Sequence, residues 1–272
     1  MVLGSTHVLK MEEIIMQELD EYSMRDSGEA IIVPVGMSPV HSLRLVKSLS
    51  DGGFDLMVLA VSDQTEKTGG LILELIGDLK AKSEMIHYSD AKNLVLGCPE
   101  IKKWNLLIGP GTRSMPVTLW GDLVNSLGES PTIWVDYRRK TKKGKGKPIE
   151  GERIVNLDNK DEFYKIQNID EIDACAIYGI NLEDFGNLGE LTWNTTSSIF
   201  TYHVRVPKDA VGYSATKARK WEERVVKKAK ILRDKIGRHA LRITRSRVPS
   251  KPRYWIRVSE RLEDFGIKGG VK

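Results

Sequence analysis

Residues 30–50, AIIVPVGMSPVHSLRLVKSLS, decide the fold class of this chain. The run AIIVPVG stays apolar until it ends at Gly36, which is typical of a parallel strand buried on both faces of its sheet. Pro39 then stands at a favourable first helical position, and apolar residues recur at helical spacing from Leu43 onward. The stretch therefore predicts a buried strand that passes directly into a helix.

The same alternation continues through the first half of the chain. Apolar runs predict further strands over 54–62, 83–89, 104–109 and 131–137, and periodic runs predict helices over 67–82 and 115–128. Strands that alternate with helices indicate βαβ units and a doubly wound parallel sheet. Right-handed crossovers place the carboxyl ends of such strands at one edge, where ligands bind. The prediction is an α/β, Rossmann-like fold.

The C-terminal part of the chain differs in charge. Residues 205–272 carry 21 Lys and Arg against 7 Asp and Glu, a net charge of +14, whereas the rest of the chain carries 21 against 30. A basic block favours a polyanionic partner, and a solubilising tail is the other interpretation. Residues 198–208 predict a strand and 214–236 a helix, while 238–262 alternate between apolar residues and arginines as a hairpin does. We expect a small basic α+β module.

Between these parts, residues 138–154 are rich in Lys and Gly and predict a solvated hairpin loop. Residues 160–180 predict a last strand and a short helix that complete the sheet. The Gly-, Asn- and Thr-rich segment 185–198 is typical of a domain boundary. The predicted domains are therefore residues 1–184, a ligand-sensing domain, and 198–272, the basic module.

Composition argues against several classes of protein. No run of 18 or more apolar residues occurs, so no membrane span is expected, and the N-terminal residues turn acidic too early for a secretory signal. Cys98 and Cys175 are far apart and lack the spacing of a metal site or a disulfide framework. We expect a cytoplasmic protein with buried thiols, no metal and no resident cofactor.

Three predicted strand ends carry glycine or hydroxyl residues where a helix follows. Glycine lets a ligand approach the backbone, and helix N-terminal N–H groups favour an anion. Hydroxyl, amide and guanidinium groups hold ribose and phosphate oxygens, although each loop alone also fits a plain strand-to-helix turn. The G-x-G-x-x-G and G-x-x-x-x-G-K-[ST] patterns are absent, which argues against a dehydrogenase or a kinase. The candidate ligand-binding residues are Gly36, Met37, Ser38, Pro39, Ser62, Gln64, Thr65, Gly109, Gly111, Thr112, Arg113 and Ser114.

The chain resembles a CARF domain, the CRISPR-associated Rossmann fold, in VGMSPVHSLRLVKSLSDGGFDLMVLAVSDQTEKT, LIGPGTRSMPVTLW and TIWVDYRRK, within about residues 28–182. The resemblance implies a homodimer that binds one cyclic oligoadenylate across its two-fold axis and controls an attached effector. It also implies that residues 37–39, Ser62 with Thr65, and 111–113 shape the pocket. Pro110 departs from the family's usual glycine and removes an N–H that would face phosphate, and an arginine replaces lysine three residues later.

The segment RDKIGRH, from Arg233 to His239, loosely resembles the R-x4-6-H element of HEPN ribonucleases, although HEPN domains are helical bundles and this segment passes from a helix into a predicted strand. The resemblance implies that the arginine stabilises a pentavalent phosphate and the histidine transfers a proton. Metal-free ribonucleases of the RelE kind, which use a basic sheet, are the architectural alternative. Candidate nucleic-acid-binding residues are Arg238, Arg242, Arg245, Arg247, Arg253, Tyr254, Trp255 and Arg257.

The leading hypothesis is a dimeric antiviral-defence sensor in which a cyclic oligoadenylate controls a C-terminal module that acts on RNA, as a metal-independent endoribonuclease. Two alternatives stay open. One is a ligand-regulated, DNA-binding transcriptional regulator without catalysis, and the other is a ring nuclease that degrades the cyclic oligoadenylate.

Overall fold

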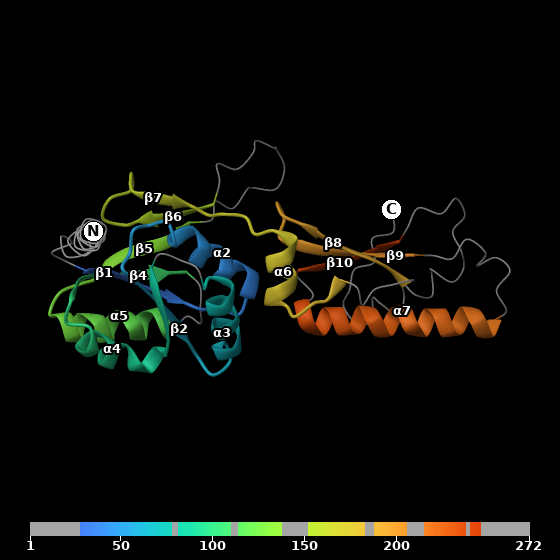
Figure 1. Cartoon of the computed structure of the whole chain (residues 1–272), viewed down its shortest axis with the longest axis horizontal. Helices are drawn as coiled ribbons and strands as arrows, with labels where there is room; N and C mark the ends of the chain where they lie inside the picture. Colours follow the sequence, from blue (N-terminus) through green and yellow to red (C-terminus); the bar gives the residue numbers. More distant parts are fainter. Residues whose placement is uncertain are drawn as a thin grey trace, which may run out of the picture. The chain divides into compact units, whose positions relative to one another are not determined.

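The computed structural model describes residues 28–77, 81–109, 114–137, 152–182, 188–205, 215–237 and 240–245. These residues form two compact units, one of residues 28–37 and 45–166, the other of residues 38–44 and the described positions from 167 onward (Figure 1). Each unit has its own sheet. The predicted domain limits lie elsewhere in the sequence, and they stay a prediction.

The described strands of the first unit form one sheet in the order β3-β2-β1-β4-β5-β6-β7. Neighbouring strands from β3 to β5 pair in parallel, and β6 and β7 extend the sheet as antiparallel strands beside β5. The predicted Rossmann-like α/β fold is confirmed. The strands are β1 (Gly28–Pro34), β2 (Leu56–Val61), β3 (Lys82–His87), β4 (Ile101–Ile108), β5 (Thr132–Tyr137), β6 (Arg153–Asn156) and β7 (Phe163–Lys165).

Helices connect the parallel strands, and α4 and α5 together cover one face of the sheet (Figure 1). Val95 of α4 and Leu119 of α5 share an apolar core with Ile32 of β1. The predicted helix over 67–82 is too long, since the helix ends at Leu75 and Lys82 already belongs to β3. The sequence pattern does not predict α4, whose 7 residues are too few for a clear periodicity. The elements are α2 (Pro39–Leu49), α3 (Glu66–Leu75), η1 (Tyr88–Asp90), α4 (Ala91–Gly97) and α5 (Ser114–Leu127).

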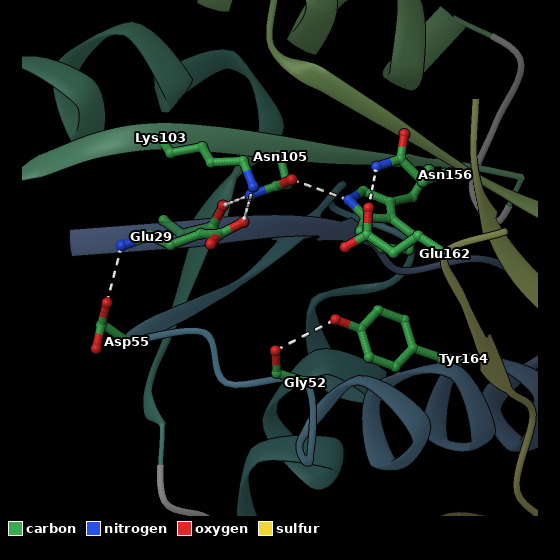
Figure 2. Close-up of polar contacts among 10 residues, drawn as sticks. Glu29, Gly52, Asp55, Lys103, Asn105, Asn156, Glu162 and Tyr164 are labelled. Atoms are coloured by element: carbon green, nitrogen blue, oxygen red, sulfur yellow. Dashed lines mark hydrogen bonds and ion pairs between the residues drawn. The ribbon is translucent and has the colours of Figure 1, made fainter. Parts of the chain in front are cut away.

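A polar network centred on the buried Asn105 holds the central strands together (Figure 2). Asn105 of β4 is 0% exposed, and its Nδ2 donates to Glu29 Oε1 (2.9 Å) and to the carbonyl O of Ala30 (3.0 Å). Its Oδ1 accepts from Nε1 of Trp134 (2.9 Å). Lys103 adds an ion pair to Glu29 at 2.8 Å. One amide therefore fixes the register of β1, β4 and β5, and with it the alignment of their carboxyl ends.

The described strands of the second unit form a sheet in the order β10-β9-β8. β8 is antiparallel to β9, and β10 is parallel to β9 after the crossover through α7. Segment 185–198, predicted as a domain boundary, contains β8. The composition of this segment is typical of a turn, but it forms a strand in which Leu191 is buried. The ring centroids of Trp193 and Phe200 lie 4.8 Å apart. The elements are α6 (Glu171–Ile177), β8 (Gly189–Asn194), β9 (Ile199–Val204), α7 (Ala215–Ile236) and β10 (Leu241–Arg245).

α7 confirms the predicted amphipathic helix over 214–236. Val225, Ala229 and Leu232 are buried at helical spacing, while most lysines and arginines of the helix are exposed. Gly237 ends the helix with φ +84°, a conformation that favours glycine. The helix therefore covers its sheet with an apolar stripe and presents basic residues outward.

Candidate functional sites

The carboxyl ends of β1, β2 and β4 meet at one edge of the parallel sheet, which we call the carboxyl edge. β1 lies between β2 and β4, and the N–H of Val35 donates to the carbonyl O of Ala60 (2.8 Å) just past the end of β1. The connection from β1 leads to β2 on one side, and the connection from β4 leads to β5 on the other side, so the strand order reverses between β1 and β4. Ligands of open α/β sheets bind at such a switch point. The predicted loops thus follow strands that end at the expected position.

The loop after β1 combines a buried backbone with an exposed apolar side chain. Gly36 is buried, whereas Met37 is 68% exposed. Ser38 follows in the chain, and its carbonyl O accepts the N–H of Ser42 (3.0 Å), while Pro39 is the first residue of α2, as predicted. An exposed thioether is a polarisable surface on which a planar base packs well.

The Ser-x-x-Thr element after β2 forms a closed turn. The N–H of Ser62 donates to Thr65 Oγ1 (2.9 Å), and the two hydroxyls lie 3.2 Å apart. The carbonyl O of Ser62 accepts the N–H of Thr65 (2.8 Å) and of Glu66 (2.9 Å). Thr65 is only 2% exposed, whereas Ser62 is half-buried and Gln64 is exposed. This geometry favours a role for Thr65 in shaping the loop and leaves Ser62 and Gln64 as the more accessible candidates.

The loop after β4 begins with a close approach of two strand ends. Gly109 has φ +147°, and a Cβ at this position would lie 2.7 Å from the Cβ of Asp136 in β5. Glycine is therefore required here by both conformation and space. Ser114 is exposed and begins α5. The next four positions lie outside the described residues. They are Pro110, where the sequence departs from the CARF pattern, and the predicted ligand-binding residues Gly111, Thr112 and Arg113.

Sequence reasoning missed two groups at the carboxyl edge, Asp136 and His87. His87 is the last residue of β3, and its Nε2 lies 3.5 Å from Asp63 Oδ1 in the loop after β2. Its Nδ1 lies 2.7 Å from Ser89 Oγ. Their positions could have indicated them, because each residue lies at or near the carboxyl end of a strand that the sequence does predict.

The sheet of the second unit has one apolar and one polar face. In β9, Phe200 and Tyr202 are fully buried, whereas Thr201 and His203 between and beside them are half-buried. Residues opposite one another on neighbouring strands share a face, so the register extends this alternation to β8 and β10. The polar side chains of this face, which we call the polar face, are Glu190, Thr192, Asn194, Thr201, His203, Arg242 and Thr244, and Ile199 lies on it opposite Asn194.

His203 lies at the centre of the polar face and contacts both neighbouring strands. Its Nε2 is 3.2 Å from Thr192 Oγ1, and its Nδ1 is 2.8 Å from Thr244 Oγ1. A neutral imidazole has one donor and one acceptor nitrogen, while a hydroxyl serves as either. The two threonines therefore satisfy both tautomers of the ring and fix its orientation. The sequence analysis missed this histidine, although the alternation in IFTYHV places it on the polar side.

The residues predicted for catalysis, Arg233 and His239, and those predicted to bind nucleic acid are only partly described. Arg233 lies in the last turn of α7, where its Nη2 is 2.8 Å from Asp234 Oδ1. Arg242 is exposed on the polar face, and the backbone of Arg245 stands opposite Val204. The pairing of Arg233 with His239 stays a prediction. His239, Arg238, Arg247, Arg253, Tyr254, Trp255 and Arg257 lie outside the described residues.

Within the described ranges, no group of three or more His, Cys, Asp or Glu side chains is arranged to hold a metal ion. None of the described helices is both long and apolar enough to cross a membrane. Burial raises the pKa of the Cys175 thiol to about 11, and burial also raises the pKa of the half-buried Cys98. Neither thiol has the lowered pKa of a nucleophile.

No known family profile matches the sequence, and no curated protein matches it. A solved structure described as a type III CRISPR defence DNA nuclease activated by cyclic oligoadenylate is 10% identical, with a TM-score of 0.52 over 89% of this chain and 42% of that one. Can2 from Sulfobacillus thermosulfidooxidans, in complex with cyclic tetra-adenylate, is 10% identical, with a TM-score of 0.39 over 85% of this chain and 57% of that one. VC1899 from Vibrio cholerae is 11% identical, with a TM-score of 0.40 over 75% and 47%.

The first of these comparisons shows a shared fold. The predicted resemblance to CARF-domain proteins of type III CRISPR systems is therefore confirmed at the level of the fold. This chain spans about half the length of the chains that it matches.

Proposed function

We propose that this chain is a CRISPR-associated sensor that binds a cyclic oligoadenylate at the carboxyl edge. One observation carries the proposal: three strand ends that are followed by glycine or hydroxyl residues meet at the switch point of a fold shared with a nuclease described as activated by cyclic oligoadenylate. Two copies of the chain around one ring, as the resemblance implies, complete the proposed sensor.

The chemistry of the carboxyl edge suits such a ring. Backbone N–H groups near Gly36 and Gly109 and the hydroxyl of Ser62 match phosphate and ribose oxygens. The exposed side chain of Met37 matches the face of an adenine. Asp136 repels a phosphate, but its carboxylate accepts hydrogen bonds from ribose hydroxyls and adenine amino groups. Each chemical part of the ring therefore has a complementary group at this edge.

We further infer that the second unit acts on RNA when the ring is bound. The net charge of +14 over residues 205–272 favours a polyanion, and the polar face combines an exposed arginine with an imidazole. DNA is the second candidate substrate, because the structure with a TM-score of 0.52 is described as a DNA nuclease.

The test uses the full chain with labelled RNA and labelled DNA, each with and without cyclic tetra-adenylate or cyclic hexa-adenylate. Ring-dependent cutting of RNA supports the proposal. Cutting of DNA alone supports the second candidate, a DNA shift without cutting supports a transcriptional regulator, and loss of the ring itself supports a ring nuclease.

A pair of variants tests the ring site separately. Thr112→Ala combined with Arg113→Ala abolishes ring binding in isothermal titration calorimetry while the circular dichroism spectrum is retained. Lys160→Ala is the matched control, because Lys160 is exposed in the β6–β7 connection beside the amino end of β5. Unchanged affinity in the double variant would contradict the ring site. Light scattering with and without the ring then gives the number of chains per complex.

A further inference from the structure

We propose that His203 is a catalytic residue, the general base for metal-independent cleavage of RNA on the polar face of the β8–β9–β10 sheet. This inference rests on the proposed action on RNA and names the group that performs it. It differs from the sequence hypothesis, which assigns the proton transfer to His239.

The position of His203 in the sheet carries the first step of the argument. It stands on the central strand with Glu190 opposite it on β8 and Thr244 opposite it on β10. The other face of the same strand is filled by buried Phe200 and Tyr202. An imidazole held on a rigid strand, with an apolar core behind it and partial exposure in front, has the fixed geometry that proton transfer requires.

The hydrogen bonds of the His203 imidazole carry the second step of the argument. In the tautomer whose Nδ1–H donates to Thr244 Oγ1, Nε2 keeps its lone pair and accepts from the Thr192 hydroxyl. The contact at Nδ1 is 2.8 Å and the contact at Nε2 is 3.2 Å, so the weaker bond is at Nε2. A substrate hydroxyl replaces Thr192 at Nε2, while Thr244 keeps the ring in place. Thr244 is thus a positioning residue.

The charges of the polar face carry the third step. Arg242 is exposed and stands opposite Thr201, one face position along β9 from His203. Arg242 and His203 are therefore diagonal neighbours on this face, and a side chain as long as arginine reaches across such a diagonal to a phosphodiester held beside the imidazole. Arg242 therefore binds the phosphate whose neighbouring ribose reaches His203. Glu190 is the one carboxylate among the described residues of this face, and it lies across from the imidazole.

The chemistry then selects RNA. Nε2 of His203 takes the proton of a ribose 2′-hydroxyl, and the 2′-oxygen forms a bond to the adjacent phosphorus. The bond from phosphorus to the 5′-oxygen breaks, the leaving oxygen takes a proton from water, and the imidazolium returns its proton to solvent. The products are a 2′,3′-cyclic phosphate and a 5′-hydroxyl, with no change in oxidation state. DNA lacks the hydroxyl that begins this sequence.

The experiment follows cleavage of end-labelled RNA by the full chain with cyclic tetra- or hexa-adenylate. His203→Gln and His203→Ala slow cleavage by about 100-fold or more, while RNA binding and ring binding stay within twofold. Thr244→Val slows cleavage by about tenfold because the imidazole of His203 is no longer held in place, and Thr244→Ser restores the cleavage rate. Thr196→Val, the same change at an exposed turn residue at the other end of β9, leaves the rate unchanged.

A substrate control keeps the test independent of variant folding. The wild-type chain must leave a 2′,3′-cyclic phosphate and must not cut RNA that carries a single 2′-deoxynucleotide at the cleavage position. Cutting of that substrate, or full activity of both His203 variants, overturns the role of His203 and leaves the proposed function standing. A wild-type chain that cuts no RNA overturns the proposed action on RNA and this inference together, and ring binding is then judged on its own.

Discussion

Replacing Thr65 by valine separates two roles for a residue that the CARF resemblance places in the pocket. Valine keeps the shape of threonine but removes the oxygen that accepts the N–H of Ser62 at 2.9 Å and lies 3.2 Å from its hydroxyl. The N–H of Ser62 then loses its acceptor in a part-buried loop, which costs about 1–2 kcal/mol. Because Thr65 is 2% exposed, we expect the free energy of unfolding to fall by that amount, and ring affinity to fall with it as the loop shifts.

The assay pairs urea denaturation with calorimetric titration of cyclic tetra- or hexa-adenylate. Thr65→Ser retains the oxygen and should keep both quantities near the wild-type values. Thr118→Val, the same change at an exposed position of α5, should alter neither. A Thr65→Val chain that loses ring affinity while its unfolding free energy stays within about 0.5 kcal/mol of wild type would refute the positioning role, because direct contact with the ligand would then be the better explanation.

Two further predictions concern stability. Asn105→Ala leaves the buried indole N–H of Trp134 without its acceptor and opens a small cavity. Urea denaturation should therefore show that the free energy of unfolding falls by about 2–4 kcal/mol. Lys103→Met should lower it by less than about 1 kcal/mol, because the ion pair between Lys103 and Glu29 is half exposed. Burial raises the pKa of Tyr202 to about 12, above the value near 10 of an unfolded chain, so its stabilising contribution is complete below pH 10 and is lost as the pH rises toward 12. Unfolding free energies measured from pH 9 to 11.5 should fall less steeply in Tyr202→Phe, and identical slopes would contradict this assignment.

The central strands β1 and β2 of the first sheet were predictable because they are buried on both faces. The run AIIVPVG contains no polar residue that would suggest an amphipathic helix, and Gly36 at its end lies two residues past the last residue of the strand. The same reasoning fails for β8, where only one face is buried and the solvent side carries Glu190 and Thr192 among turn-forming residues. It also fails for Asn105, since a single polar residue inside an apolar strand gives no indication of which strands its amide will join.

The candidate sites divide along the same line. Loops that follow predicted strands, such as those at Gly36 and Ser62, could be assigned to the carboxyl edge because parallel strands bring their ends together by topology alone. Thr65 shows the limit of that approach, since the sequence gives its position in the loop but not that its hydroxyl turns inward to Ser62.

The two candidate proton-transfer groups of the second unit differ in how the sequence can indicate them. The pattern from Arg233 to His239 joins two residues that are close in the chain, as a helix or a loop would require. A sheet instead brings its side chains together across strands, and the two threonines that bind His203 are 11 and 41 residues away from it in the sequence. The contact between Thr244 and His203 exists because β10 pairs in parallel with β9. The sequence predicts instead that residues 238–262 form a hairpin of their own, and a hairpin that did not pair with β9 would leave His203 with Thr192 alone. If the polar face is the working surface, cleavage should therefore respond to Thr244 as well as to His203.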